Sequence, residues 1–364
     1  MGRALELAAA GRGAVSPNPL VGAVIVDRGG AVLGEGHHAV LGGPHAEAAA
    51  LADALERGAD PAGATMYVTL EPCAHEGRQP PCADAILDAG IARVVIGCDD
   101  PSAKASGRGP GILRDGGVDV AWAEGPDAAA ARLLNQPFRK HARTGRPLVT
   151  LKSAVTLDGR TATGGGESRW ISGPASRELV HRWRAEADAI AVGIGTALAD
   201  DPALTARGVA VRRQPLRVVF DAKARLPTAS RLVATLDEGP ILALAGAGAP
   251  PGRIAALRDA GVEVVQLPGA GAAQVGPALA ELGRRGATSL LLEGGATLAG
   301  AFRDAGEIDE LRLFHAPILL GGAAARPLVG GAGAGGIAAA ERALAVDWER
   351  SGEDLLVRAR MREW

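Results

Sequence analysis

One histidine, one glutamate and two cysteines stand at spacings that suit a catalytic zinc ion. They occur in the segments His45-Ala46-Glu47, Glu71-Pro72-Cys73 and Pro80-Pro81-Cys82. A catalytic zinc site takes about three protein ligands and leaves one position open for water. His45, Cys73 and Cys82 offer one imidazole and two thiolates, and zinc-bound water loses a proton near pH ~7. These residues therefore predict a hydrolytic zinc centre.

Glu47 supplies the proton carrier that hydrolytic deamination of a nucleobase needs. A carboxylate that is not a metal ligand takes a proton from water and delivers it to the ring nitrogen and the departing amine. Residues two apart on a helix diverge by roughly 200°. His45 and Glu47 can therefore serve one metal only if it lies off the helix N-terminus, where Pro44 places them. Cys82 is also expected to open a helix, where a thiolate is favoured.

A structural zinc site is the alternative to this interpretation. The nucleobase deaminase signature has Pro-Cys-x-x-Cys after His-x-Glu, whereas Cys73 and Cys82 are nine positions apart. A closed site needs a fourth protein ligand, and His75 is available. Such a site has no use for Glu47, so we favour the catalytic interpretation.

The composition narrows the class of protein. A chain of 364 residues is long enough for two domains. Its net charge of −2 and its aromatic content of 3% argue against a nucleic-acid partner, which would call for a basic face with stacking rings. The apolar runs have only strand length, so no membrane partner is expected. Three cysteines, an odd number, suit a reducing cytoplasm better than a disulfide framework.

Apolar runs alternate with helical patterns along the whole chain, which is typical of an α/β protein. Residues 127–143 are expected to form one helix, and Thr144-Gly145-Arg146-Pro147 breaks it. We therefore predict two domains, over residues 1–145 and 146–364. The strands expected in the first domain are 21–26, 31–36, 65–70 and 93–97, with helices at 44–57 and 82–89. In the second domain they are 148–153, 189–192, 216–220, 241–245, 262–266, 289–292 and 311–315, with helices at 175–186 and 296–305.

Two turns of the second domain suit a dinucleotide. Gly193-Ile194-Gly195 and Glu293-Gly294-Gly295 each follow an apolar strand and precede a helical stretch. Such turns let backbone N–H groups approach a phosphate. Neither is a full G-x-G-x-x-G motif, so each by itself is equally compatible with an ordinary helix start.

The order of several segments resembles the bifunctional deaminase/reductase family of riboflavin biosynthesis. In the first domain they are Pro17-Asn18-Pro19-Leu20-Val21-Gly22, His45-Ala46-Glu47, Thr69-Leu70-Glu71-Pro72-Cys73-Ala74-His75 and Gly77-Arg78-Gln79-Pro80-Pro81-Cys82. In the second they are Thr156-Leu157-Asp158-Gly159-Arg160, Gly166-Glu167-Ser168-Arg169-Trp170-Ile171, Asp200-Asp201-Pro202-Ala203-Leu204-Thr205 and Glu293-Gly294-Gly295. The long cysteine spacing is that family's own variant, and the resemblance covers almost the whole chain.

This resemblance implies a fold and two reactions. The fold is a cytidine-deaminase-like three-layer α/β/α domain followed by a dihydrofolate-reductase-like α/β domain. The first reaction deaminates 2,5-diamino-6-(5-phosphoribosylamino)pyrimidin-4-one with one Zn²⁺ per chain. The second uses NADPH to reduce the ribosyl group of the product to ribityl. The implied partner is this phosphoribosylated pyrimidine, and a homo-oligomer is expected because symmetric assemblies are common.

The resemblance also implies roles for individual residues. Glu47 is catalytic, with His45, Cys73 and Cys82 as metal ligands. The residues implied for NADPH are Ala154, Trp170, Thr196, Asp200, Gly294 and Gly295. Those implied for substrate are Asn18, Ser168, Arg184, Leu204, Arg207 and Glu293. Arginine suits a ribose phosphate because its planar fork binds oxygens in pairs.

Three other functions compete with this interpretation. A nucleic-acid base deaminase is disfavoured by the charge and the few aromatic residues. A zinc-stabilised binding module leaves Glu47 and the second domain without a purpose. The third is an enzyme that has lost one of the two activities. Loss of the reductase stays open because Ala222 stands where many members of the resembled family carry serine.

Overall fold

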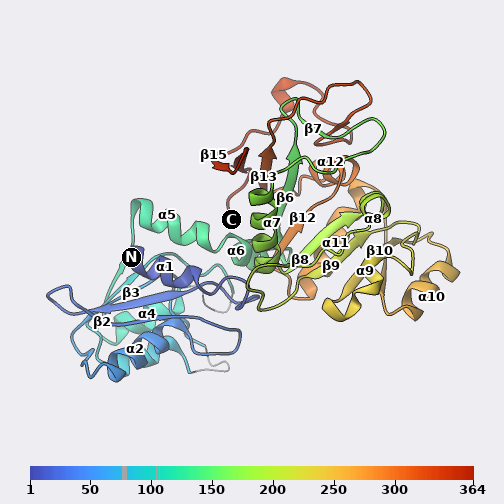
Figure 1. Cartoon of the computed structure of the whole chain (residues 1–364). Helices are drawn as coiled ribbons and strands as arrows, with labels where there is room; N and C mark the ends of the chain where they lie inside the picture. The colour runs from blue at the N-terminus through green and yellow to red at the C-terminus, as the bar shows by residue number, and fades with distance from the viewer. Residues whose placement is uncertain (76–79, 104, 106) are drawn as a thin grey trace. The chain divides into compact units, whose positions relative to one another are not determined.

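A computed structural model of the chain describes residues 1–75, 80–103, 105 and 107–364. Two compact units make up this structure: residues 1–145 together with Trp364, and residues 146–363 (Figure 1). The division falls between Gly145 and Arg146, directly after the last helix of the first unit. Within the described part of the chain, no helix is long and apolar enough to cross a membrane.

The first unit is built on a five-stranded sheet in the order β2-β1-β3-β4-β5. Strand β1 pairs antiparallel with β2 and β3, whereas β3, β4 and β5 run parallel. Parallel strands end at the same edge of a sheet, so the segments that follow β3 and β4 emerge together. The bounds are β1 Gly22–Val26, β2 Val32–His37, β3 Thr65–Val68, β4 Arg93–Ile96 and β5 Asp119–Trp122.

Helices cover both faces of this sheet (Figure 1). Gly22 of β1 faces α1 (Gly2–Ala9), and α1 contacts α5 (Gly125–Leu134). On the other face, Gly36 of β2 lies against α2 (Ala46–Glu56), and the main core of the unit joins α2 to α3 (Cys82–Asp88) and α4 (Arg108–Asp115). The unit therefore has three layers, helices on either side of a sheet.

The second unit contains a nine-stranded sheet in the order β11-β10-β9-β8-β12-β6-β13-β16-β15. All neighbours from β11 to β13 are parallel, and β13, β16 and β15 are antiparallel. The bounds are β6 Leu148–Val155, β8 Ala189–Gly193, β9 Leu216–Phe220, β10 Ile241–Gly246, β11 Glu263–Leu267, β12 Ser289–Leu292, β13 Glu310–His315, β15 Ala345–Ser351 and β16 Asp354–Arg360. A small separate sheet pairs β7 (Arg160–Ala162) with β14 (Arg326–Pro327).

Two apolar cores lie on opposite faces of this sheet, because its parallel strands alternate their side chains between them. One core holds Ile190, Val192 and Val219 with helices α7 to α10, and the other holds Ala189, Ala191 and Val218 with α11 and α12. The helices are α7 Pro174–Glu186, α8 Ile194–Asp200, α9 Arg231–Ala234, α10 Pro251–Asp259, α11 Ala272–Arg284 and α12 Ala296–Asp304, with short 3₁₀ turns at Leu236–Glu238 and Ile337–Ala339.

The single helix expected over residues 127–143 is wrong. The structure has two helices there, α5 and α6 (Gln136–Thr144). Asn135 lies between them with φ −106°, and its side chain donates to the Leu20 carbonyl and accepts from the Leu20 N–H at 2.9 and 2.8 Å. Pro137 has no N–H to continue the preceding helix and suits the first turn of a new one.

Helix α2 lies so close to β2 that Gly36 has no room for a side chain. A Cβ at Gly36 would stand 2.3 Å from the Ala50 backbone nitrogen and 2.6 Å from the Ala46 carbonyl oxygen. We predict that Gly36→Ala destabilises the first unit by about 1–3 kcal/mol, because the helix must move off the sheet. Calorimetry of the full chain would show the first unit's transition lowered. Leu55→Ala is the control, since Leu55 of α2 is exposed and a change there costs within about 0.5 kcal/mol; an equal loss in both variants would contradict the prediction.

Candidate functional site

The three predicted metal ligands and Glu47 lie at the starts of two helices. His45 is the N-cap residue of α2 in extended conformation, and Glu47 is in its first turn. Cys82 is the first residue of α3, and Cys73 lies on the segment that follows β3. The structure thus places His45 and Glu47 at a helix N-terminus, as their spacing predicts.

The ligand atoms of His45, Cys73 and Cys82 converge on one point. They all lie within 4.8 Å of one another. The His45 Nδ1 is 3.2 Å from the Cys82 Sγ and 3.5 Å from the Cys73 Sγ. A tetrahedral zinc with Zn–N of about 2.0 Å and Zn–S of about 2.3 Å sets its nitrogen and sulfur ligands roughly 3.5 Å apart. The donor set and its spacing therefore fit a zinc ion.

The two thiols have very different proton affinities. Hydrogen bonds from Cys82 and from His45 lower the pKa of Cys73 to about 4. The same contact with Cys73, together with burial, raises the pKa of Cys82. The Cys82 backbone N–H also points at the Cys73 sulfur, 3.4 Å away. Cys73 is therefore prepared as a thiolate before any metal binds, which is the form in which cysteine acts as a ligand.

Glu47 is a buried carboxyl group beside this cluster. Only 3% of the residue is exposed. Burial raises the pKa of Glu47 to about 7, because desolvation disfavours the charged form. A carboxyl group of such proton affinity can both take and release a proton near neutral pH.

A cavity of about 690 Å³ opens onto the cluster and Glu47. Its walls come from the segment before β1, the turn before α2, the ends of β3 and β4, and helix α6. The wall residues that matter here are Asn18, His38, Glu71, His75, Asp100, Ser102, Phe138 and His141, and the cavity also contacts His45, Glu47 and Cys73. This volume falls within the range of small-molecule sites.

Buried His38 sets the orientation of the Asn18 amide. The His38 Nδ1 is 2.9 Å from the Pro44 carbonyl, which only accepts, so Nδ1 carries the proton. Burial lowers the pKa of His38, and in the neutral ring Nε2 then accepts. It lies 3.1 Å from the Asn18 Nδ2, which must donate. The Asn18 Oδ1 is left as the acceptor.

His75 lines the same cavity, but it is not part of the metal cluster found among the described residues. Its Nδ1 is buried without a hydrogen-bond partner in that part of the structure. The fourth protein ligand that a closed zinc site requires is therefore not present in the described residues. Gly77, Arg78 and Gln79, quoted above for the resemblance, lie outside them.

In the second unit, Glu293 is the centre of a buried cluster of charges. Arg184 of α7 donates to both of its carboxylate oxygens, at 2.6 and 2.9 Å. The Lys152 Nζ of β6 lies 3.6 Å away. Burial would raise the pKa of Glu293, but the charges of Arg184 and Lys152 outweigh it and hold the pKa at about 2. Burial conversely lowers the pKa of Lys152.

The two glycine turns lie at the ends of neighbouring parallel strands. Gly193 ends β8, and α8, which carries Thr196, follows directly. Gly294 and Gly295 follow β12, and Gly295 is the N-cap residue of α12. Because β8 pairs with β12, and β12 with β6, these turns meet at one edge of the sheet. Crevices at such edges are the usual ligand sites of open α/β sheets.

The remaining predicted residues of this unit lie in three places. Asp200, at the end of α8, lies near the 168–170 segment, with its carboxylate 3.5 Å from the Ser168 hydroxyl. Trp170 is 70% exposed, and the Arg177 guanidinium lies 4.6 Å from the centre of its ring. Ala154 and Leu204 belong to or pack against the apolar core, so the Leu204 side chain, 2% exposed, does not face a ligand. Arg207 is exposed, and its guanidinium donates to the Thr205 hydroxyl.

The sequence did not predict the contacts that Lys152, His181, His38 and Glu71 make. Lys152 carried a signal, because it is the one charged residue of a largely apolar strand. The His181 Nδ1 accepts from the Arg207 N–H at 3.2 Å. Neither this contact nor the hydrogen bonds of His38 follow from a local motif, since they join residues 6 to 26 positions apart that belong to different segments.

Together, the three-layer fold and the His/Cys/Cys cluster beside a buried glutamate define a zinc-dependent deaminase domain, here joined to a second α/β unit. The comparisons agree with this class. Residues 1–98 match the cytidine and deoxycytidylate deaminase zinc-binding region. Residues 147–357 match the RibD C-terminal domain.

Proteins named riboflavin biosynthesis protein RibD align with nearly the whole chain. The one from Actinobacillus pleuropneumoniae is 40% identical over 358 residues, covering 98% of this chain and 93% of the relative. That of Escherichia coli K12 is 41% identical over 338 residues and covers 88% of each. A crystal structure of a deaminase/reductase from Thermotoga maritima has a TM-score of 0.86 at 35% identity, covering 99% of this chain and 97% of the other.

The chain belongs to the RibD family. It is a bifunctional enzyme of riboflavin biosynthesis, a pyrimidine deaminase joined to a reductase. Its first unit carries the zinc-binding region with a His/Cys/Cys site, and the expected fold classes of both domains are confirmed.

Removing Arg184 tests the charge balance around Glu293. We predict that Arg184→Met lowers the free energy of unfolding of the second unit by about 3 kcal/mol at pH 7, because Glu293 loses its bidentate partner. Glu293, with a lowered pKa, stabilises the wild type above its unfolded pKa of about 4.3, and this stability is lost as pH falls toward 2. In the variant Glu293 takes up a proton at higher pH.

The difference in the free energy of unfolding between variant and wild type is therefore expected to shrink as pH falls from the pKa of Glu293 in the variant toward its wild-type value of about 2. Urea denaturation at a series of pH values measures it. The double variant Arg184→Met, Glu293→Gln serves as the control, since it keeps Lys152 as in the single variant but has no carboxylate at position 293 that could take up a proton. A difference that is independent of pH would contradict this account of the cluster.

Proposed function

We propose that the chain converts 2,5-diamino-6-(5-phosphoribosylamino)pyrimidin-4-one in two consecutive steps. Residues 1–145 form the deaminase, which replaces the 2-amino group by oxygen and releases ammonia. Residues 146–364 form the reductase, which converts the ribosyl group to ribityl. The observation that carries the proposal is the His45, Cys73 and Cys82 cluster, which opens with Glu47 onto one cavity. The Thermotoga maritima relative is named a diaminohydroxyphosphoribosylaminopyrimidine deaminase and 5-amino-6-(5-phosphoribosylamino)uracil reductase.

In the first step, His45, Cys73 and Cys82 would hold zinc, and Glu47 would move the protons. Zinc supplies a Lewis acid that makes water a nucleophile near neutral pH. Glu47 would take one proton from the attacking water and pass it to the ring nitrogen, and would then move the second proton of that water to the amine, which leaves as ammonia. Its burial suits this role, because a pKa raised to about 7 lets the Glu47 carboxyl group both take up and release a proton near neutral pH.

Asn18 would orient the pyrimidine. Its amide lies in the wall of the cavity, and the hydrogen bond to His38 leaves Oδ1 as its acceptor. An acceptor at this position suits an N–H group of the substrate, and the diaminopyrimidine carries several. The Pro44 carbonyl that fixes the His38 ring directly precedes His45, so base recognition and metal ligation share one support.

In the second step, the residues at the strand ends would hold substrate and cofactor. NADPH supplies the hydride. Thr196 follows the first glycine turn and Gly294 and Gly295 belong to the second, and the N–H groups of these turns suit the cofactor phosphates. Asp200 would reach the cofactor from the end of α8, while Ala154 and Trp170 would contact the nicotinamide half. Ser168, Arg184, Arg207 and Glu293 offer charged and hydrogen-bonding groups to the ribose and its phosphate, and Leu204 would contribute through its backbone alone.

A cytoplasmic location and self-association stay predictions.

A two-substrate assay separates the steps. We predict that purified wild-type protein oxidises NADPH when given the diaminopyrimidine, and that Glu47→Ala does so only when given the deaminated intermediate. Loss of the general acid and base slows deamination by at least about 10²-fold. Ammonia release and NADPH absorbance, at fixed zinc, follow the two steps.

The intermediate given to the variant controls for the integrity of the second unit. Wild-type protein that oxidises NADPH with neither substrate would exclude the reductase proposal. Ammonia release unaffected by Glu47→Ala would exclude the role of Glu47.

A change at Asn18 tests base recognition. We predict that Asn18→Asp raises KM for deamination about tenfold or more, because a carboxylate cannot donate to the His38 Nε2 as the amide does. Steady-state ammonia release measures it. The neighbouring variant His37→Gln is the control, since His37 is not among the residues that line the cavity; an unchanged KM in Asn18→Asp would remove Asn18 from recognition.

A further inference from the structure

Glu71 is a buried carboxylate that the proposed mechanism does not use. It is 4% exposed and lies two residues before the metal ligand Cys73. Burial raises the pKa of Glu71, whereas hydrogen bonds from two backbone N–H groups act against that rise. A buried carboxylate is costly unless its oxygens are hydrogen-bonded, so the groups that donate to it indicate its purpose.

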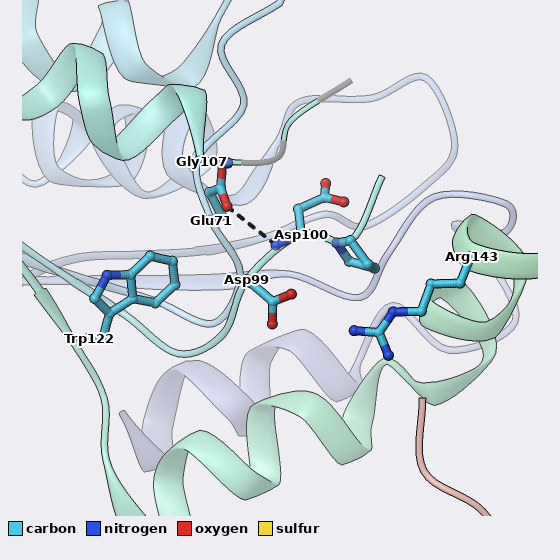
Figure 2. Close-up of a pocket in the computed structure, with 7 residues that line it drawn as sticks. Glu71, Asp99, Asp100, Gly107, Trp122 and Arg143 are labelled. Atoms are coloured by element: carbon cyan, nitrogen blue, oxygen red, sulfur yellow. Dashed lines mark hydrogen bonds between the residues drawn. The ribbon is translucent and has the colours of Figure 1, made fainter. Parts of the chain in front are cut away.

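Both oxygens of Glu71 hold the loop that follows β4. The Gly107 N–H donates to Oε1 at 2.6 Å, and the Asp100 N–H donates to Oε2 at 3.4 Å. Figure 2 shows the Glu71 carboxylate between these two points of the loop, at the edge of a shallow cavity that Asp99, Trp122 and Arg143 also line. One side chain thus fastens both ends of the segment from Asp100 to Gly107.

This segment forms part of the wall of the deaminase cavity. Asp100 and Ser102 line the cavity together with His45, Glu47 and Cys73. The Ser102 N–H donates to the Asp100 carboxylate at 2.7 Å, which keeps the turn closed. Because Glu71 holds Asp100 in place, it also determines how far this wall of the cavity lies from the metal ligands.

The segment after the loop is fitted to Glu71 and Pro72 as well. Gly107 adopts φ +80°, a conformation that glycine reaches without strain, and this turns its N–H toward Glu71. Two residues on, a Cβ at Gly109 would stand 1.9 Å from the Pro72 carbonyl oxygen. The start of α4 therefore lies directly on the residue that precedes Cys73.

We propose that Glu71 is a positioning residue of the deaminase: it holds the chain at Asp100 and at Gly107 and thereby fixes the Asp100 and Ser102 wall of the pyrimidine cavity relative to Cys73. The inference rests on the proposed deaminase. Glu71 acts through the loop and does not contact the reacting atoms. Its loss impairs substrate binding more than turnover, and leaves reduction on the same chain unchanged.

The test compares Glu71→Ala and Glu71→Gln in the full, zinc-loaded chain. Glu71→Ala is expected to raise KM for deamination about tenfold or more with a smaller change in kcat, because both fastenings are lost. Glu71→Gln keeps one acceptor for the Gly107 N–H and is expected to recover part of the loss. Zinc content and reduction of the deaminated intermediate should equal those of wild type. A wild-type KM in Glu71→Ala, or a loss of zinc from both variants, would overturn the proposal.

Hydrogen exchange gives a readout that does not depend on activity. Amides of residues 99–107 should exchange faster in Glu71→Ala, while those of β1 and α2 remain as in wild type. If these amides exchange no faster in the variant than in wild type, the proposal is overturned. A wild-type enzyme that releases no ammonia overturns only the proposed function.

A glycine pair covers the case in which Glu71→Ala does not fold. Gly107→Ala strains the donor side of the same hydrogen bond and is expected to raise KM. Gly111→Ala, in the same helix, adds a methyl group with nothing within 4 Å and should leave KM unchanged. Equal KM values in these two variants overturn the proposal.

Discussion

The contact between α2 and the glycines of β2 is the constraint on which the deaminase unit depends. The backbones of β2 and α2 meet without any side chain between them at Gly34 and Gly36. A helix seated so closely has a fixed start, and that start carries both His45 and Glu47. The predicted metal ligand and the predicted proton carrier therefore share one rigid support, which a catalytic geometry requires.

The two units solve the problem of buried charge in different ways. Around the metal cluster, hydrogen bonds within the Cys73, Cys82 and His45 group place negative charge on one thiol, which a cation can then neutralise. Around Glu293, two cations are already supplied by the chain. The first arrangement is completed by a bound ion, whereas the second is balanced before any ligand arrives.

Local pattern was sufficient where structure follows from local rules. Apolar runs predicted every strand of the parallel part of the second sheet. Pro44 marked the start of the helix beside His45, and Cys82 was expected to open the next helix. The pattern failed where distant contacts decide. Asn135 ends α5 because it bonds to Leu20, more than a hundred residues away. Strand β15 is exposed along almost its whole length, and β16 combines a short apolar run with Asp354, Arg358 and Arg360, so neither stands out as a strand.

The same limit applied to the sites. The metal ligands and Glu47 lie in short motifs, so spacing and resemblance identified them. His38 and Glu71 act through hydrogen bonds to backbone groups of other segments, and such bonds leave no signature in residue type. For Leu204 the resemblance implied a substrate contact, but the structure shows its side chain packed in the apolar core.

The wall contributed by α6 makes the catalytic pocket larger than the sequence region that defines its chemistry. The zinc-binding match ends at residue 98, yet Phe138, His141 and Ala142 of α6 line the cavity, and Asn135 fastens this helix to Leu20, beside Asn18. A fragment cut at the end of the match would keep all three ligands and Glu47 but would leave the pocket open to solvent on one side. The smallest piece of this chain that keeps the whole wall of the cavity thus extends through α6, whereas the matched region alone holds the predicted reactive groups without that wall.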